Sequence, residues 1–183
     1  IGGIDMKRDI KILLPLLFVF LCSTVFAQEQ ETKEIVGNWT VSVEINPLTD
    51  EKEIYLCVYS EDYKESKLFS DRKALYIRFM EEPDLFIVWN KYLGNNTNIR
   101  YKFDNGEIWK EEWYPSADKT ALFCPTELGI RNFIKKATNA KKLVVGVTPY
   151  NKTEQTAVFN LEGLKEAITP YLSDFGWEDL FEE

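Results

Sequence analysis

Apolar and polar residues alternate along most of the chain, and this two-residue period predicts β-strands. The clearest run covers residues 39–45, where Trp39, Val41 and Val43 alternate with polar residues until Asn46-Pro47 ends the run. Asp104-Asn105-Gly106 between two such runs is typical of a β-hairpin turn. The same pattern predicts further strands at residues 54–59, 75–79, 85–93, 99–103, 108–114, 143–147 and 156–159.

A helical period appears twice in the C-terminal half of the chain. Thr126 can cap a first helix, whose apolar face would consist of Ile130, Phe133, Ile134 and Ala137. A second stripe, ended or kinked by Pro170, would consist of Leu161, Leu164, Ile168 and Leu172. We therefore predict an α+β fold: a mainly antiparallel β meander or sandwich with two amphipathic helices in the C-terminal half. With no repeat or linker in residues 35–183, we expect one globular domain there.

The first residues predict export. Lys7, Arg8 and Lys11 precede an apolar stretch, and Val25-Phe26-Ala27 is typical of a signal-peptidase site, so we expect cleavage after Ala27. A membrane anchor is the alternative, but the stretch is short and contains Pro15. Residues 1–27 would thus be upstream residues plus a signal peptide, and the polar residues 28–34 a disordered lead-in. The expected location is periplasmic or secreted, without a membrane anchor after cleavage.

Net charge narrows the range of partners. The chain carries 30 Asp and Glu residues against 22 Lys and Arg residues, for a net charge of −8. Such a chain repels phosphate backbones and anionic lipid headgroups. We expect a protein or cell-wall partner and no nucleic acid.

Histidine is absent, which excludes Ser-His-Asp and Cys-His catalysis and removes imidazole ligands for zinc or haem. Ser116 and Lys119 have the S-x-x-K spacing of serine-lysine acylases, but they fall in a predicted loop, whereas that chemistry needs both on one buried helical turn. The acidic clusters lack the spacing of a calcium loop. We predict no catalytic, cofactor-binding or metal site, and a protein that is not an enzyme.

Two cysteines, Cys57 and Cys124, follow the expected cleavage site. In an oxidising compartment they can form a single disulfide. The alternative is two buried thiols that pack as small apolar residues.

Aromatic residues are concentrated in the central predicted strands. Trp109 and Trp113 share a strand face with Glu111 between them. If this face is exposed, its aromatic rings would suit contact with a partner protein or stacking on sugars. The alternative is that most of the aromatic rings of these strands fill the core. The set consists of Trp89, Tyr92, Tyr101, Trp109, Trp113 and Tyr114.

The order of these motifs resembles the VasI/TagO-like periplasmic proteins associated with type VI secretion. The similarity covers nearly all of the chain after residue 38. It is carried by residues 39–44, Pro47-Leu48-Thr49-Asp50, Leu75-Tyr76-Ile77-Arg78, Trp89-Asn90-Lys91-Tyr92-Leu93, Tyr101-Lys102-Phe103-Asp104, Trp113, Ser116, residues 118–121, Phe123, Phe133-Ile134, residues 142–145, Thr148-Pro149-Tyr150, residues 159–164, Ala167-Ile168 and Trp177.

The resemblance implies a non-enzymatic periplasmic accessory protein that acts by protein–protein contact, and it offers no catalytic residue. On that basis the contact surface would be the outward side of the central strands, including Arg78, Tyr92, Trp109 and Trp113. Two alternatives stay open: a carbohydrate- or peptidoglycan-binding module, and a periplasmic inhibitor or immunity protein.

The chain departs from the resembled family at two positions. That family has a cysteine after the arginine of the third strand and another before the final tryptophan, where this chain has Phe79 and approximately Phe175. If those cysteines are joined in the family, an aromatic contact would replace a covalent link here.

Overall fold

A computed structural model describes residues 32–64 and 73–182 of the chain. The expected signal peptide, its cleavage site and the start of the lead-in lie outside the described residues. The lead-in prediction is wrong from Thr32 onward, because strand β1 (Thr32–Val36) begins there and pairs with the next strand. Strand β1 is an edge strand with a mostly polar sequence, and it lacks the apolar alternation that identifies β2 as a strand.

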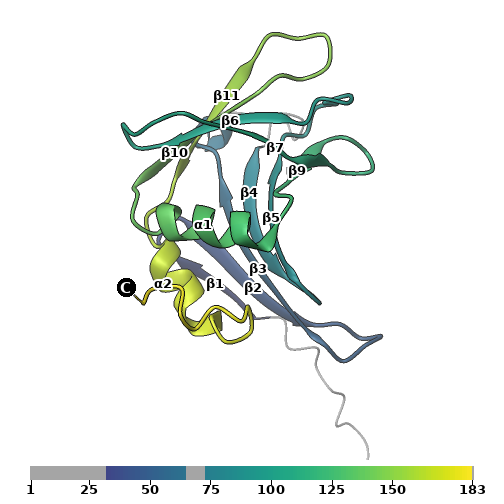
Figure 1. Cartoon of the computed structure of the whole chain (residues 1–183). Coiled ribbons are helices and arrows are strands. Elements are labelled where there is room, and N and C mark those ends of the chain that lie inside the picture. Colours follow the sequence, from purple (N-terminus) through teal and green to yellow (C-terminus); the bar gives the residue numbers. More distant parts are fainter. Residues whose placement is uncertain (1–31, 65–72, 183) are drawn as a thin grey trace, which may run out of the picture.

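The described strands form two antiparallel sheets (Figure 1). The large sheet has the order β1-β2-β3-β4-β5-β9-β8, and the small sheet has the order β11-β10-β6-β7. The remaining bounds in the large sheet are β2 (Trp39–Ile45), β3 (Lys52–Tyr59), β4 (Ala74–Phe79), β5 (Pro83–Val88), β9 (Ala121–Phe123) and β8 (Tyr114–Pro115). The small sheet contains β11 (Gln155–Asn160), β10 (Lys142–Val147), β6 (Asn98–Phe103) and β7 (Trp109–Glu112).

The helices cover one face of the large sheet. Helix α1 (Glu127–Ala137) crosses in front of β4 and β5 in Figure 1 and contacts β5, whereas α2 (Leu164–Ile168) contacts β1 and β2. Short 3₁₀ turns follow β3 (η1, Glu61–Lys64) and α2 (η3, Thr169–Tyr171). The α+β prediction is confirmed, as is the Thr126 cap, whose hydroxyl accepts a hydrogen bond from the Gly129 amide at 3.1 Å.

The core lies between this covered inner face, the helices and the small sheet. Strand β3 illustrates how alternation in the sequence builds this core: every second residue, Ile54, Leu56 and Val58, points inward and is almost fully buried. Burying one such side chain contributes about 1.5–3 kcal/mol. The largest fully buried side chains are Trp39, Trp89, Trp113 and Trp177.

Three predicted elements differ from the structure. The strand predicted at 85–93 ends at Val88, because Asn90 has a positive φ of 53° and Trp89 and Leu93 donate instead to the turn between β8 and β9. The strand predicted at 108–114 is divided, with β7 in the small sheet and β8 in the large one. The second helix is one short turn of α-helix, which Gly163 (φ 93°) precedes and Pro170 follows within η3.

The turn between β1 and β2 packs backbone against backbone on the start of α2. The Asn38 amide donates to the Glu162 carbonyl at 3.1 Å, and the Trp39 indole donates to the Leu161 carbonyl at 3.3 Å. Gly37 and Gly163 make this approach possible, since a Cβ on Gly37 would lie 2.4 Å from the Glu162 carbonyl oxygen. The first hairpin is thereby joined to the C-terminal part of the chain.

Phe79 and Phe175 are in contact, with ring centroids 5.6 Å apart and planes tilted by 60°. The expected aromatic contact between these two positions is confirmed. Phe175 also stacks on Trp177 at 4.6 Å, so Phe79 on β4 is linked through Phe175 to the buried Trp177. That the contact replaces a covalent link remains a hypothesis.

Replacing Phe79 with alanine should lower the free energy of unfolding by about 3 kcal/mol, the lower end for buried Phe because this ring is half-buried. Urea denaturation of Phe79→Ala measures the loss. Tyr150→Ala is the control, since its ring is 59% exposed and its removal should cost no more than about 0.5 kcal/mol. Equal midpoints for the two variants would contradict the prediction.

Candidate functional site

The four residues expected on one contact surface lie in different environments. Arg78 is on the outer face of β4, and Tyr92 follows β5 and packs edge-on against Tyr150 with centroids 5.6 Å apart. Trp109 is on β7 beside α1 and 40% exposed, whereas Trp113 is fully buried. The structure therefore does not bring the four together.

The prediction that Trp113 contacts a partner is wrong. Its indole donates to Glu111 at 2.8 Å, and the other oxygen of Glu111 accepts from the Tyr101 hydroxyl at 2.5 Å. Phe133 of α1 packs on the Trp113 ring with centroids 6.0 Å apart. Trp109 and Trp113 do share a face by alternation, but α1 covers that face at Trp113.

The two cysteines form no disulfide with each other in the structure. Cys57 is on the outer face of the large sheet, in register with Tyr76. Cys124 follows the outward Phe123, packs against the core, and has its pKa raised to about 11 by burial. The two thiols therefore lie on opposite sides of the sheet, and of the two alternatives that the sequence leaves open, the disulfide is not the one that the structure has.

The Ser116 and Lys119 pair does not have the geometry of an acylase site. The Ser116 hydroxyl bonds to Asp118 at 2.6 Å and accepts from the Ala121 amide at 3.0 Å in the turn between β8 and β9. Lys119, with φ 56°, donates to Asn95 at 2.6 Å. Within residues 32–64 and 73–182, no group of three or more His, Cys, Asp or Glu side chains is placed to hold a metal ion.

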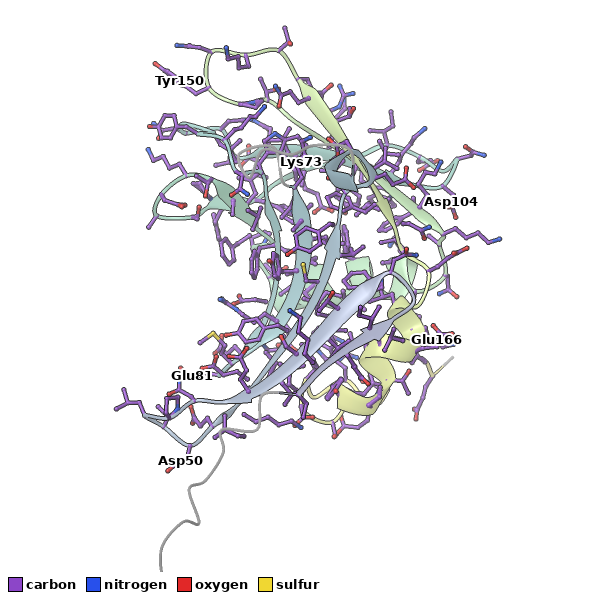
Figure 2. All side chains as sticks on the ribbon, turned by 180° about the vertical axis from the view of Figure 1, so that it is seen from behind. Asp50, Lys73, Glu81, Asp104, Tyr150 and Glu166 are labelled. Carbon is purple, nitrogen blue, oxygen red and sulfur yellow. The ribbon has the colours of Figure 1, made fainter. Side chains whose placement is uncertain are left out.

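The outer face of the large sheet carries a row of aromatic rings. One residue from each of four neighbouring strands lies in register, namely Tyr76, Phe86, Phe123 and Tyr114, which we call the aromatic row. Phe86 stacks on Tyr76 at 5.0 Å and on Phe123 at 4.6 Å. Neither α1 nor α2 crosses this face, as the view from behind shows (Figure 2).

Charged and hydroxyl groups border the aromatic row. The Arg78 guanidinium lies 5.1 Å from the Phe86 ring centroid and forms an ion pair with Asp84. Beside Tyr76 is a depression of about 280 Å³. Its lining includes Lys33, Thr40, Ser42, Glu44, Tyr55, Cys57 and Tyr59. The row and this depression together form what we call the outer sheet face.

Glu53, on the same face of β3 as Tyr55, is held in its charged form. Hydrogen bonds from the Tyr55 hydroxyl at 2.5 Å and the Asn46 amide at 2.7 Å lower the pKa of Glu53. Burial and then the bond to Glu53 raise the pKa of Tyr55 to about 12. Burial also raises the pKa of Tyr76. At neutral pH the outer sheet face therefore presents neutral phenols beside a carboxylate.

Acid should destabilise the protein partly through Glu53. A carboxyl group with a lowered pKa stabilises the folded state above its unfolded-state pKa, and this contribution is lost as the pH falls through the folded-state pKa. We expect the free energy of unfolding to fall below about pH 4.5, the ordinary pKa of Glu53, and Glu53→Gln to reduce the slope. Urea denaturation at a series of acidic pH values measures this pH dependence of the free energy of unfolding. The exposed Glu51 gives the control: Glu51→Gln should keep the wild-type profile, and a parallel profile for Glu53→Gln would contradict the assignment.

Of the aromatic row, only Tyr114 was among the aromatic residues singled out from the sequence, although a signal for Tyr76 and Phe86 was also present. Tyr76 alternates with Leu75 and Ile77, and Phe86 alternates with Leu85 and Ile87. These two rings must therefore lie on the face opposite the buried residues. Local alternation does not show, however, whether a helix or a second sheet covers the face that carries Tyr76 and Phe86.

No protein family matches the chain, and no curated protein matches it. Among solved structures, the chain is similar to the crystal structure of invasion associated protein B from Bartonella henselae. The TM-score is 0.55 at 10% sequence identity, over 78% of this chain and 96% of that chain. The likeness is one of fold. In addition, none of the described helices is both long and apolar enough to cross a bilayer.

Proposed function

We propose that this protein is an exported, non-enzymatic accessory protein that acts by binding another protein, similar to the type VI secretion-associated periplasmic proteins that its sequence resembles. The observation that carries the proposal is the aromatic row on the outer sheet face. Tyr114 is 64% exposed, and Tyr76 and Phe123 are half-buried, on a face that neither α1 nor α2 crosses. Export is supported by the signal-peptide pattern of the first residues.

The size of the outer sheet face suits a protein partner. Beyond the aromatic row, the same register continues from Tyr76 to Cys57 on β3 and Thr40 on β2, so the outer sheet face spans the strands from β2 to β8. At a strand spacing of about 4.8 Å this distance is roughly 24 Å. A standard interface buries about 800 Å² on each partner, which corresponds to a patch of similar width. Tyrosine, phenylalanine and arginine are also the residue types enriched at such interfaces.

Charge defines the partner further. Glu44 and Glu53 lie on the outer sheet face together with Lys33, whereas Arg78 and Asp84 neutralise each other in their ion pair, and the whole chain has a net charge of −8. A partner with an apolar centre and a basic margin would be complementary to this surface. Its association rate should therefore fall as the salt concentration rises.

Site-specific photocrosslinking in the exporting cell tests the proposal. A photoreactive residue at Tyr114 or Tyr76 should give one discrete adduct, and the same residue at Leu128, which is 69% exposed on α1, should give none. Tyr76→Ala should weaken binding of the purified partner at least about 10-fold, a change of about 1.4 kcal/mol. Tyr150→Ala, an exposed aromatic outside this face, should leave that affinity unchanged.

Three results would contradict the proposal. One is equal crosslinking from Leu128 and Tyr114. Another is retention of the chain in the cytosol without processing after Ala27, which N-terminal sequencing would reveal. The third is a partner hydrolase that loses its activity on binding, because it would favour the inhibitor alternative.

A further inference from the structure

A groove on the helix-covered side of the molecule lies between the β6–β7 hairpin and the C-terminal half of α1. Its volume is about 550 Å³. The hairpin contributes Glu107 and Trp109, and α1 with its following turn contributes Asn132, Lys135, Lys136 and Asn139. Asp104 begins the hairpin turn and lies far from Asp50, on the other side of the view in Figure 2. The groove shares no lining residue with the depression or the aromatic row of the outer sheet face, so the two surfaces are separate.

Trp109 provides a partly exposed aromatic surface in this groove. It lies on β7, which pairs with β6 alone among the described strands, so the indole is 40% exposed. The Lys136 ammonium lies 4.8 Å from the ring centroid and holds the indole by a cation–π contact. A fixed indole with an apolar body and an N–H that makes no hydrogen bond within the described residues suits a ligand that has apolar C–H faces and a polar rim.

Several polar groups around Trp109 have no partner among the described residues. The Asn132 amide, the Glu107 carboxylate and the Trp109 indole N–H make no hydrogen bond within that part of the chain. Lys135 has a single long contact of 3.4 Å, to the Glu182 carbonyl. The groove thus offers donors and acceptors together on either side of one ring.

The charges in the groove favour a neutral ligand. Lys135 and Lys136 face Asp104 and Glu107, so the lining carries equal numbers of positive and negative groups. An acidic peptide would gain little from such a lining and would be repelled by the net charge of −8. The volume lies within the range of about 300–1,000 Å³ that is usual for small-molecule sites.

We propose that this groove binds a saccharide, with one sugar ring packed against the part of the Trp109 indole that Lys136 leaves exposed and its hydroxyl groups bonded to Asn132, Glu107 and the two lysines. A sugar presents the required combination, because its ring C–H groups form an apolar face and its hydroxyl groups both donate and accept. The expected affinity is that of a shallow open site, with a dissociation constant of about 1 mM. The site is independent of the partner surface proposed above.

Titration of the folded protein with chitobiose, cellobiose and maltose tests the proposal, with tryptophan fluorescence and two-dimensional NMR as readouts. At least one disaccharide should bind saturably and shift the Trp109 indole resonance. Trp109→Ala and Asn132→Ala should each weaken binding at least about 10-fold. Tyr114→Ala, on the outer sheet face, should bind the sugar as the wild type does, which separates this site from the proposed function.

The second substitution keeps the test decisive if Trp109→Ala unfolds the protein, since Asn132 is a helix-surface residue. Absence of saturable binding for all three disaccharides would overturn the proposal. Binding that survives both Trp109→Ala and Asn132→Ala would also overturn it, because the sugar would then lie elsewhere. A poly-glutamate peptide that binds in the groove while the sugars do not would replace the saccharide with an acidic peptide.

Discussion

Replacing Gly37 with alanine should lower the free energy of unfolding by about 2 to 5 kcal/mol. The residue has φ +61°, where a side chain costs about 1–2 kcal/mol. The new Cβ would also lie 2.4 Å from the Glu162 carbonyl oxygen, a backbone atom that a side-chain rotation does not relieve. Forced overpacking of this kind costs about 1–3 kcal/mol. Gly163→Ala should behave similarly, with a Cβ 2.6 Å from the Val36 carbonyl oxygen.

Gly176 provides the matched control for this prediction. Its φ of +66° is almost the same, but an added Cβ would meet nothing within 4 Å. Gly176→Ala should therefore cost only the conformational part, about 1–2 kcal/mol. Urea denaturation of the three variants measures the difference. If Gly37→Ala and Gly176→Ala lost the same stability, the close backbone approach would not be a constraint in solution.

Replacing Trp113 with alanine should have the other large effect, a loss of about 3–5 kcal/mol of folding stability. The indole is fully buried against Phe133, so its removal leaves a cavity. Its removal also takes one hydrogen bond from Glu111, which still accepts from Tyr101. Trp113→Phe keeps most of the ring volume and should lose only about 1–2 kcal/mol.

The comparison with Trp109 makes this prediction specific. Trp109→Ala removes a 40%-exposed ring and should change stability by no more than about 1 kcal/mol. Thermal denaturation followed by circular dichroism distinguishes the two tryptophans. A Trp113→Ala variant with an unchanged melting temperature would contradict the core position of this side chain.

Elements with a purely local cause could be predicted from the sequence. Strand β2 was found by its alternation, the β6–β7 hairpin by Asp104-Asn105-Gly106, and the start of α1 by the Thr126 cap. The limits of β5 could not be found in the same way. Leu93 is as apolar as a strand residue, but its amide donates to Lys119, a partner that is distant in sequence.

The candidate surfaces depended more on tertiary structure than the strands did. Alternation places Tyr76 opposite Leu75, and this much is local. Whether the second face meets solvent depends on where α1 docks, and the same docking buries Trp113 but leaves Trp109 in an open groove. The position of Cys124 relative to Cys57 depends in turn on the strand order, because β9 joins the sheet beside β5.

The junction between Gly37 and Gly163 has a consequence for the order of folding. The Trp39 indole bonds to the carbonyl of Leu161, a separation of 122 residues, so the first hairpin cannot complete its contacts until nearly the whole polypeptide is present. Contacts this distant in sequence slow the folding of a domain. Under the export proposed above, such a delay would keep the chain unfolded, and so competent to cross a membrane, until its last segment has been synthesised.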